Sequence, residues 1–237
     1  MDKAVYKRVI IKLSGEALAG STGFGIDEDM LSYVVGQIKK VTEEGVQVGI
    51  IVGGGNFWRG RQALNMEKSA ADHMGMLATV MNSIALQDAL EAHGIPTRVQ
   101  TALTITRVAE PYILRKALHH FEKGRIVIFA CGTGNPFFST DTGAALRAAE
   151  INAEVLLLAK NVDGIYDSDP AVNPDAKKYD RLTFSDIINK GLKAMDTTAA
   201  TMCMENNIPV LAFALFEKDS IVRAVCGETL GTLISNG

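Results

Sequence analysis

The chain has 237 residues, of which 47% are hydrophobic and 22% are charged, and its formal net charge at pH 7 is −3. This is the composition of an ordinary globular protein with enough chain to bury a sizeable core. The small negative charge excludes an overall electrostatic field that would attract nucleic acid, so we expect no nucleic-acid partner.

The three cysteines, Cys131, Cys203 and Cys226, lie far apart and form no CxxC pair, which is typical of reduced thiols in a cytoplasmic protein. The apolar stretch near the N-terminus is too short for a signal peptide, and no apolar run approaches the ~20 residues of a membrane span. No linker rich in proline, glycine or serine divides the chain. We therefore expect a single domain over residues 1–237, located in the cytoplasm and without a membrane partner.

Short apolar runs alternate with longer amphipathic segments along the whole chain. Most of the short runs are almost continuously hydrophobic, which indicates strands buried on both faces of a parallel sheet. The predicted strands are residues 9–13, 46–52, 97–103, 125–130, 154–159, 208–215 and 231–235. The predicted helices are residues 28–44, 69–93, 110–123, 142–152, 185–190, 197–206 and 217–226.

Capping signals support several of these helices. Asp27 is expected to cap the first one and Gly45 to end it, while Pro111 suits the first turn of the helix at 110–123. Residues 167–182, with two prolines, are predicted as a long surface loop. The repeated β-α-β order predicts a three-layer α/β/α sandwich around a mainly parallel, open twisted sheet.

Three other features are assigned to packing or to the surface. The helix at 69–93 carries an apolar stripe at helical spacing, which we expect to lie in the core. The stripe consists of Met74, Met76, Leu77, Val80, Met81, Ile84 and Leu86. Cys203 is also expected in the core, whereas His119 and His120 have no metal-ligand partner at useful spacing and are expected at the surface.

Ligands of such sheets bind beyond the carboxyl ends of the strands, and the first two loops there suit phosphate. Lys12 ends a buried strand, where an ammonium group needs an anion; the amides of Ser14 and Gly15 follow. The alternative is a lysine that extends to solvent. The next loop, residues 53–60 (GGGNFWRG), has glycines that form an anion-binding nest and Arg59 as a fork of donors, with a simple glycine turn as the alternative. Trp58 is expected to pack beneath this loop.

The loop at residues 131–143, CGTGNPFFSTDTG, combines hydrogen-bonding side chains with two adjacent aromatic rings. Its amides lie near the start of the next helix, where anions bind, and Phe137 and Phe138 offer apolar walls for a base or sugar. One of the two phenylalanines belonging to the core is the alternative. Asp141 and Asp196 each precede or begin a helix, so an ordinary N-cap role is the alternative for both. In residues 160–170, Tyr166 suits packing on a purine, with a plain polar turn as the alternative.

Six motifs in order resemble those of the bacterial uridylate kinases, the hexameric UMP kinases of the amino-acid kinase superfamily. They are KLSGEAL (12–18), GGGNFWRG (53–60), DHMGMLATVMN (72–82), GTGNPFFSTD (132–141), NVDGIYDSDP (161–170) and MDTTA (195–199). The resemblance runs from Val9 to Ile234. The first two motifs belong to the superfamily at large, whereas DHMGM and TGNPFF are more specific. Ala71 stands where a glycine is common.

The resemblance implies transfer of the γ-phosphoryl group of MgATP to UMP in pyrimidine nucleotide biosynthesis, giving UDP and ADP. It implies Lys12, Arg59, Asp141 and Asp196 as catalytic residues, with Mg²⁺ held mainly by the ATP phosphates. The implied ATP-binding residues are Lys12, Leu13, Ser14, Gly15, Gly55, Arg59, Lys160, Asn161, Tyr166 and Asp169. The implied UMP-binding residues are Gly54, Asp72, Thr133, Gly134, Asn135, Pro136, Phe137, Phe138, Ser139 and Thr140. The acceptor site is thus expected mainly in the N-terminal half together with 133–140, and the ATP site mainly in the C-terminal half.

The resemblance also implies activation by GTP, inhibition by UTP, and a homohexamer built as a trimer of dimers. The implied GTP segment is Gly20, Ser21, Thr22, Gly23, Phe24 and Gly25. Arg98 and Arg125 are candidates for an effector site between subunits, although Gln87 and Glu91 stand where some relatives carry basic residues.

Two other function classes stay open at this point. One is a kinase of another small molecule, such as acetylglutamate or carbamate, against which Asp72 and the two phenylalanines argue. The other is a non-catalytic nucleotide-binding regulator or storage protein of the same fold, against which Lys12, Arg59 and Asp196 argue. A role on DNA has no support from the net charge.

Overall fold

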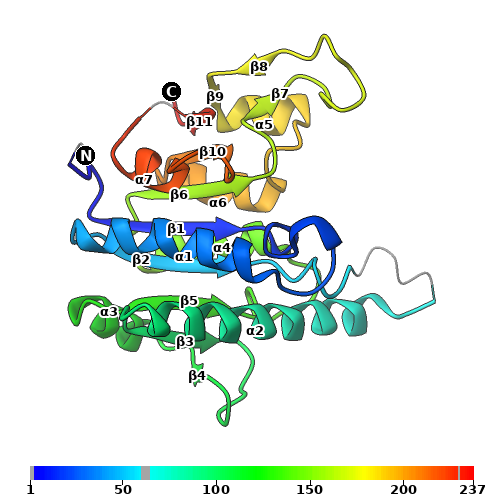
Figure 1. Cartoon of the computed structure of the whole chain (residues 1–237). Helices are drawn as coiled ribbons and strands as arrows, with labels where there is room; N and C mark the ends of the chain where they lie inside the picture. The colour runs from blue at the N-terminus through cyan, green and yellow to red at the C-terminus, as the bar shows by residue number, and fades with distance from the viewer. Residues whose placement is uncertain (1–2, 60–64, 229) are drawn as a thin grey trace.

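The computed structural model describes residues 3–59, 65–228 and 230–237, and its central element is a nine-stranded sheet (Figure 1). The strand order is β4-β3-β5-β2-β1-β6-β10-β11-β9. The strands are β1 Arg8–Leu13, β2 Gln47–Val52, β3 Thr97–Thr101, β4 Glu110–Pro111, β5 Ile126–Ala130, β6 Val155–Lys160, β9 Arg181–Thr183, β10 Val210–Ala214 and β11 Thr232–Ser235. All neighbouring pairs are parallel except β10 with β11, so the predicted mainly parallel sheet is confirmed. A separate antiparallel pair joins β7 Ile165–Tyr166 to β8 Lys178–Tyr179.

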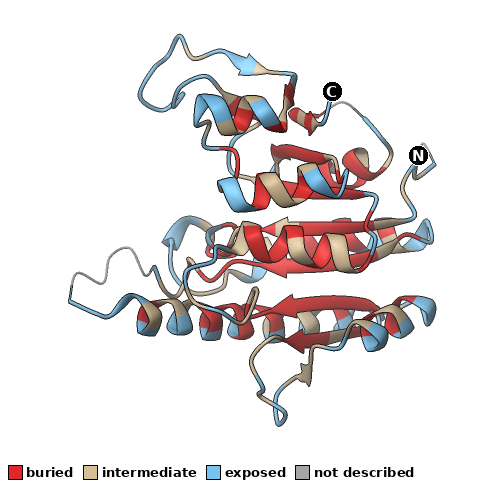
Figure 2. Cartoon of the chain, turned by 180° about the vertical axis from the view of Figure 1, so that it is seen from behind, coloured by how far each residue is buried: buried red, intermediate tan, exposed pale blue. Residues whose placement is uncertain are grey.

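Helices cover both faces of the sheet and make the predicted three layers. They are α1 Glu28–Glu43, α2 Lys68–Ala92, α3 Leu114–Glu122, α4 Thr140–Glu150, α5 Phe184–Lys190, α6 Thr197–Glu205 and α7 Ser220–Val225, with short 3₁₀ helices η1 Gly15–Leu18 and η2 Gly20–Thr22. Apolar residues of α1, α2 and α7 share one core cluster with the strands, and those of α3 to α6 share the other. In Figure 2 the central strands of the sheet are buried along nearly their whole length between these layers, whereas the short strands at its edges are partly exposed. No described helix combines the length and the apolar character that crossing a membrane requires.

Strand β1 shows how the sequence sorts its side chains between the two faces. Successive residues of a strand point to opposite faces. Val9, Ile11 and Leu13 belong to the core cluster of α1 and α2, and Ile10 belongs to the cluster of α4. By this alternation Lys12 lies on the α4 face, which becomes important at the candidate site.

The predicted helix over 110–123 is wrong at its start. Pro111 lies in β4, beside Thr101 of β3, and α3 begins only at Leu114. Proline has no amide hydrogen to give to a ladder, so it is tolerated at a sheet edge. The following amide, that of Tyr112, donates to the Thr101 carbonyl oxygen at 2.9 Å and extends this edge contact.

Local backbone chemistry fixes the other helix starts. Asp27 caps α1 as predicted, since its Oδ1 accepts from the Met30 amide at 3.0 Å. Helix α4 begins earlier than predicted because Ser139 Oγ accepts from the amides of Asp141 and Thr142. The N-cap alternative for Asp141 is therefore wrong. Helix α7 starts at Ser220, later than predicted, after Asp219 adopts a left-handed conformation with φ 53°.

The predicted loop over 167–182 is mostly loop but holds β8 and the start of β9. These strands are only two and three residues long, too short for an apolar pattern to develop. Strand β9 is placed by its pairing with β11 at the far edge of the sheet.

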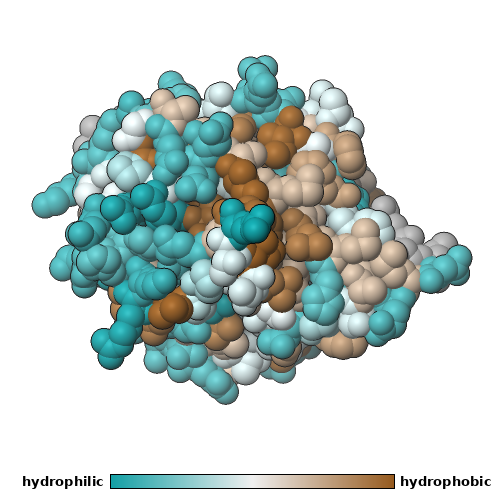
Figure 3. Space-filling view, turned by 90° about the horizontal axis from the view of Figure 1, so that it is seen from below, coloured by the Kyte–Doolittle hydropathy of each residue, from teal (hydrophilic) through white to brown (hydrophobic). Residues whose placement is uncertain are grey.

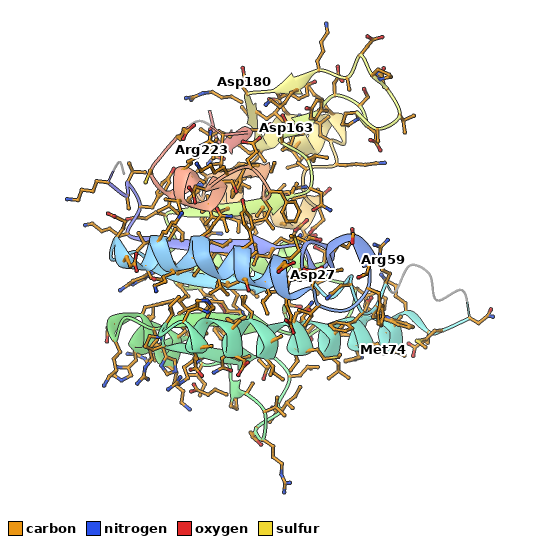
Figure 4. The ribbon with its side chains drawn as sticks, viewed as in Figure 1. Asp27, Arg59, Met74, Asp163, Asp180 and Arg223 are labelled. Atoms are coloured by element: carbon orange, nitrogen blue, oxygen red, sulfur yellow. The ribbon has the colours of Figure 1, made fainter. Side chains whose placement is uncertain are left out.

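The apolar stripe of α2 is only partly in the core, so that prediction is wrong for four of its members. Met76, Val80 and Leu86 are buried, but Met74, Leu77, Met81 and Ile84 are between 39% and 50% exposed. Figure 3 shows a broad hydrophobic area on the underside of the molecule, and Figure 4 labels Met74 on α2 at that side. An apolar row on an exposed helix face marks a surface that suits a protein partner.

Candidate active site

An ion pair between Lys12 and Asp141 marks the carboxyl end of the central strands. Lys12 Nζ lies 3.1 Å from Asp141 Oδ1, and the two side chains are only 19% and 21% exposed. Asp141 reaches this position because Ser139 caps α4 and leaves the neighbouring carboxylate free to face β1. Lys12 therefore has an anionic partner within the protein and does not extend to solvent.

The loops after β1 and β2 touch backbone to backbone. The Gly53 amide donates to the Leu13 carbonyl oxygen at 2.9 Å. A Cβ atom on Gly15 would lie 2.5 Å from the Gly53 carbonyl oxygen and 2.6 Å from Asn56 Oδ1. Glycine is thus required for this contact, and the amides of both loops are held at one place. Ser14 lies between them as the residue preceding η1.

We expect Gly15→Ala to lower the free energy of unfolding by about 1–3 kcal/mol, because the added methyl group forces the two loops apart. Gly36→Ala is the matched control, since a Cβ on this α1 residue meets nothing within 4 Å. That change is expected to stabilise the protein by about 0.5–1 kcal/mol through helix propensity. Urea unfolding at one protomer concentration measures both, and a Gly15→Ala protein as stable as the wild type would contradict the close contact.

Arg59 closes the glycine loop at the end of the sheet toward which β1 points (Figure 4). Its NH2 group lies 2.9 Å from Glu16 Oε1, and its Nε donates to the Gly55 carbonyl oxygen at 3.3 Å. The side chain is 47% exposed, so it is available to an incoming anion. Gly60, the last residue of the quoted motif, lies outside the described residues.

Asp72 holds the loop with the two phenylalanines in place. The Phe137 amide donates to Asp72 Oδ2 at 2.8 Å, and Phe137 has the unusual φ of 72°. Both Phe137 and Phe138 are exposed, at 67% and 50%, so neither belongs to the core. Strain of this kind at a non-glycine residue is typical of functional loops.

Asp196 connects the starts of two helices. It caps α6 as the N-cap alternative predicted, accepting from the Ala199 amide at 3.0 Å. The same carboxylate accepts from Thr142 Oγ1 at 3.0 Å and from Ser139 Oγ, both at the start of α4. One side chain therefore fixes α4 and α6 relative to each other beside Asp141.

A cavity of ≈ 270 Å³, here called the α2 cavity, collects most of the residues predicted to bind UMP. The residues predicted to bind UMP among its lining are Gly54, Asp72, Thr133, Asn135, Phe138, Ser139 and Thr140. Gly55, predicted to bind ATP, also lines it. Gly134, Pro136 and Phe137 belong to the same loop but do not line it. Sequence reasoning missed Trp58, Ala71, Gly75, Met76, Thr79, Cys131 and Gly132. Trp58 donates from Nε1 to the Ala71 carbonyl oxygen at 2.9 Å and forms part of the wall.

A second cavity of ≈ 420 Å³, the β7 cavity, collects Lys160, Tyr166 and Asp169. The side-chain hydroxyl of Tyr166 donates to Asp163 Oδ1 at 2.7 Å, and this bond raises the pKa of the tyrosine. Missed lining residues are Val162, Gly164, Ile165, Asp167, Ser168, Pro170 and the segment 190–193 after α5. Asn161 instead lines a separate cavity of ≈ 610 Å³ with Gly20, Ser21, Tyr33 and Phe216.

The segment Gly20–Gly25 packs against the glycine loop. The Gly25 amide and Asn56 carbonyl oxygen are 3.1 Å apart, Asn56 Nδ2 donates to the Gly25 carbonyl oxygen at 2.7 Å, and Phe24 meets Phe57 edge to face at 5.7 Å. This places the segment beside the phosphate-suited loops.

Arg98 and Arg125 lie at the opposite end of the sheet, near the starts of β3 and β5. Arg98 pairs with Glu91 at 3.0 Å, and Arg125 donates to His120 Nδ1 at 3.2 Å. His120 is buried against Glu110, so its predicted surface position is wrong, whereas His119 is exposed. Among residues 3–59, 65–228 and 230–237, no group of three or more His, Cys, Asp or Glu side chains suits a metal ion.

Comparison with known proteins gives both a family and close structural relatives. Residues 7–213 match the amino acid kinase family. The UMP kinase of Bacillus anthracis is 39% identical with a TM-score of 0.94, covering 98% of this chain and 96% of that one. The UMP kinase of Ureaplasma parvum is 38% identical with a TM-score of 0.91, covering 97% and 98%. The uridylate kinase of Archaeoglobus fulgidus is 28% identical with a TM-score of 0.74, covering 96% and 99%.

Proposed function

Because the chain belongs to the amino acid kinase family, we propose that it is a UMP kinase, which transfers the γ-phosphoryl group of ATP to UMP and gives UDP and ADP. The similarity to two UMP kinases over nearly the full length of both chains supports this assignment. The observation that carries it is the α2 cavity, which gathers Asp72, Gly54 and Gly55 of the loop after β2, and residues of the 133–140 loop at one place.

Two cavities at the carboxyl edge of the sheet suit the two nucleotides. The α2 cavity receives UMP, with Asp72 as an acceptor for the ribose hydroxyls and the 133–140 loop around base and phosphate. The β7 cavity receives the base and ribose of ATP against Tyr166 and Asp169. Lys12, near the end of β1, and Arg59, in the loop after β2, are the cations that we assign to the phosphates of the two nucleotides. This proposal keeps both sites within one domain.

Phosphoryl transfer to UMP requires charge neutralisation and alignment of the reacting groups rather than a strong base. The acceptor is a phosphate that is already anionic at neutral pH, and phosphoryl transfer depends mainly on positioned cations. Lys12 and Arg59 supply positive charge, and the amides of Gly15, Gly54 and Gly55 supply donors. Mg²⁺ usually binds one or two carboxylates together with the nucleotide phosphates. Asp141 and Asp196 fit that donor set, and the ion would neutralise the phosphate charge there.

A coupled assay of ADP production tests the function. ATP and Mg²⁺ are supplied with UMP, CMP or acetylglutamate in parallel, each with and without GTP. The expected result is turnover with UMP and with neither of the other two acceptors. Turnover only with another acceptor would contradict the roles given to the 133–140 loop. UMP binding by calorimetry without any UDP would favour the non-catalytic regulator.

The regulation implied by the family resemblance belongs to the same proposal. GTP is expected to activate and UTP to inhibit, with the Gly20–Gly25 segment acting through its contacts to Asn56. Arg98 and Arg125 are the cations proposed for an effector site between subunits. The assay with GTP reads the sign of its effect directly, and UTP is added to the same reactions. A cytoplasmic location is proposed with the function.

We expect the chain to associate with copies of itself, as a hexamer built from dimers, and the exposed row on α2 supports a dimer contact. Leu77→Glu combined with Met81→Glu places charges on this row and is expected to reduce the mass measured by light scattering during gel filtration. Val172→Glu, at an 81% exposed loop position, is the matched control. An unchanged mass in the double variant would exclude α2 as the contact.

A further inference from the structure

Lys160 is a second lysine on the same face of the sheet as Lys12. Strands β1 and β6 are neighbours, and their register places Lys12 beside Leu158. Lys160 is two residues further along β6, so its side chain has the same orientation as that of Leu158. Both lysines therefore point to the α4 side at the carboxyl edge of the sheet.

The Asp141 carboxylate is the charged neighbour that Lys12 and Lys160 share. Asp141 pairs with Lys12 at 3.1 Å, and its field also reaches Lys160. Lys160 itself is partly buried, and its side-chain amine donates to the carbonyl oxygen of Ala194 rather than to a carboxylate. Asp196, the next carboxylate along, is engaged with Ser139 and Thr142. Two ammonium groups thus share one carboxylate.

The surroundings of Lys160 lower the pKa of its side-chain amine. Burial lowers the pKa below the ordinary value for a lysine, the Asp141 carboxylate opposes that change, and the ammonium of Lys12 lowers the pKa further. A partly desolvated cation in this position gains from an anion that enters the site.

We propose that Lys160 is a second cation of the phosphoryl-transfer site, which contacts the phosphate chain of the donor nucleotide beside Lys12 instead of its base or ribose. The inference rests on the proposed function. Lys160 lines the β7 cavity with Tyr166 and Asp169, and it also lies in the field of Lys12 and Asp141. It is therefore the residue that links the cavity for base and ribose to the ion pair where the phosphates meet.

Lys160 also contacts the segment that leads into α6. Ala194, whose carbonyl oxygen it holds, comes two residues before Asp196. Entry of a triphosphate offers the amine charged oxygen acceptors that are stronger than a single carbonyl group. The start of α6 then keeps its position, because Asp196 still accepts hydrogen bonds from Ser139 and Thr142 of α4 and from the Ala199 amide of α6.

The test compares Lys160→Met, which removes the charge at similar length, with Lys160→Arg, which keeps it. Lys39→Met, at an exposed position on α1, is the control. We expect Lys160→Met to lower kcat by roughly 10- to 100-fold, less than the loss of a sole donor because Lys12 remains. The KM for UMP is expected to stay within about threefold of the wild type. Lys160→Arg is expected to recover most of kcat.

Calorimetry with two ligands separates phosphate contact from base contact. Lys160→Met should weaken the binding of ATP but leave that of adenosine unchanged, because adenosine has no phosphate. Weaker adenosine binding, or a raised KM for ATP at unchanged kcat, would overturn the inference. Loss of UMP binding together with a lower melting temperature would make Lys160 structural and would also overturn it. If the wild type forms no UDP, the proposed function fails, whereas the ATP and adenosine titrations still decide the role of Lys160.

Discussion

Lys12→Ala is expected to lower kcat by at least roughly 10²-fold, the scale of losing one donor aimed at developing charge. Lys12 is held by Asp141 at 3.1 Å in a site where little solvent is present to replace it. In the proposed reaction, a cation preorganised in this way would stabilise the transferring phosphoryl group without rearranging when charge develops. Steady-state kinetics with varied ATP and UMP measure kcat and both KM values.

Lys7→Ala is the matched control for this change, because Lys7 is exposed just before β1. It is expected to leave kcat within about twofold of the wild type. A Lys12→Ala enzyme within the same range would show that the lysine has no role in the chemical step. A rise in KM for ATP alone would assign Lys12 to binding that is equal in ground and transition state.

Asn82→Leu is expected to lower the free energy of unfolding by about 2–4 kcal/mol, because it leaves buried polar groups without partners. Asn82 and Asn56 are at most 1% exposed and exchange two amide hydrogen bonds of 2.9 and 2.7 Å. Asn82 Nδ2 also donates to the Gly53 carbonyl oxygen at 2.7 Å. The substitution therefore removes the hydrogen bonds by which α2 supports the loop at residues 53–60. Urea unfolding at constant protomer concentration gives the difference.

A double-mutant cycle sharpens this prediction. Asn56→Leu combined with Asn82→Leu should cost less than the sum of the single changes, since replacing both partners leaves fewer unpaired groups. Asn206→Leu, at the exposed end of α6, is the control and is expected to cost under about 1 kcal/mol. Strict additivity of the two buried changes would contradict the direct coupling of the amides.

The layers and the positions of the main strands along the chain could be predicted because buried parallel strands have almost no polar residues. Strand β6, with its continuous run of leucines, is the clearest case. Strands β4 and β9 could not be predicted, because they are too short for a pattern and depend on pairing with strands far away in the sequence. The start of α4 could not be predicted either, because it depends on whether Ser139 or Asp141 supplies the cap.

The candidate site was predictable where a motif follows a strand and less so where a helix forms its wall. Gly75 and Thr79 of α2 line the α2 cavity, but their spacing is also that of an ordinary buried helix face. Helical periodicity likewise placed Met81 in the core, although the face that carries it is exposed. Periodicity indicates that a face is apolar; only the packed structure shows what covers it.

The antiparallel strand β11 has a consequence for how the chain folds as it leaves the ribosome. Among the residues that the structure describes, strand β9 pairs in the sheet with β11 alone, and β11 is made some fifty residues later. Thr232 of β11 also accepts from the Ile165 amide at 2.8 Å and donates to the Tyr179 carbonyl oxygen at 2.5 Å. The segment around β7 and β8, with the wall of its cavity, therefore gains these two hydrogen bonds only after β11 is synthesised. A nascent chain that still lacks β11 would present the central strands in order while the β7 cavity lacks the support of Thr232.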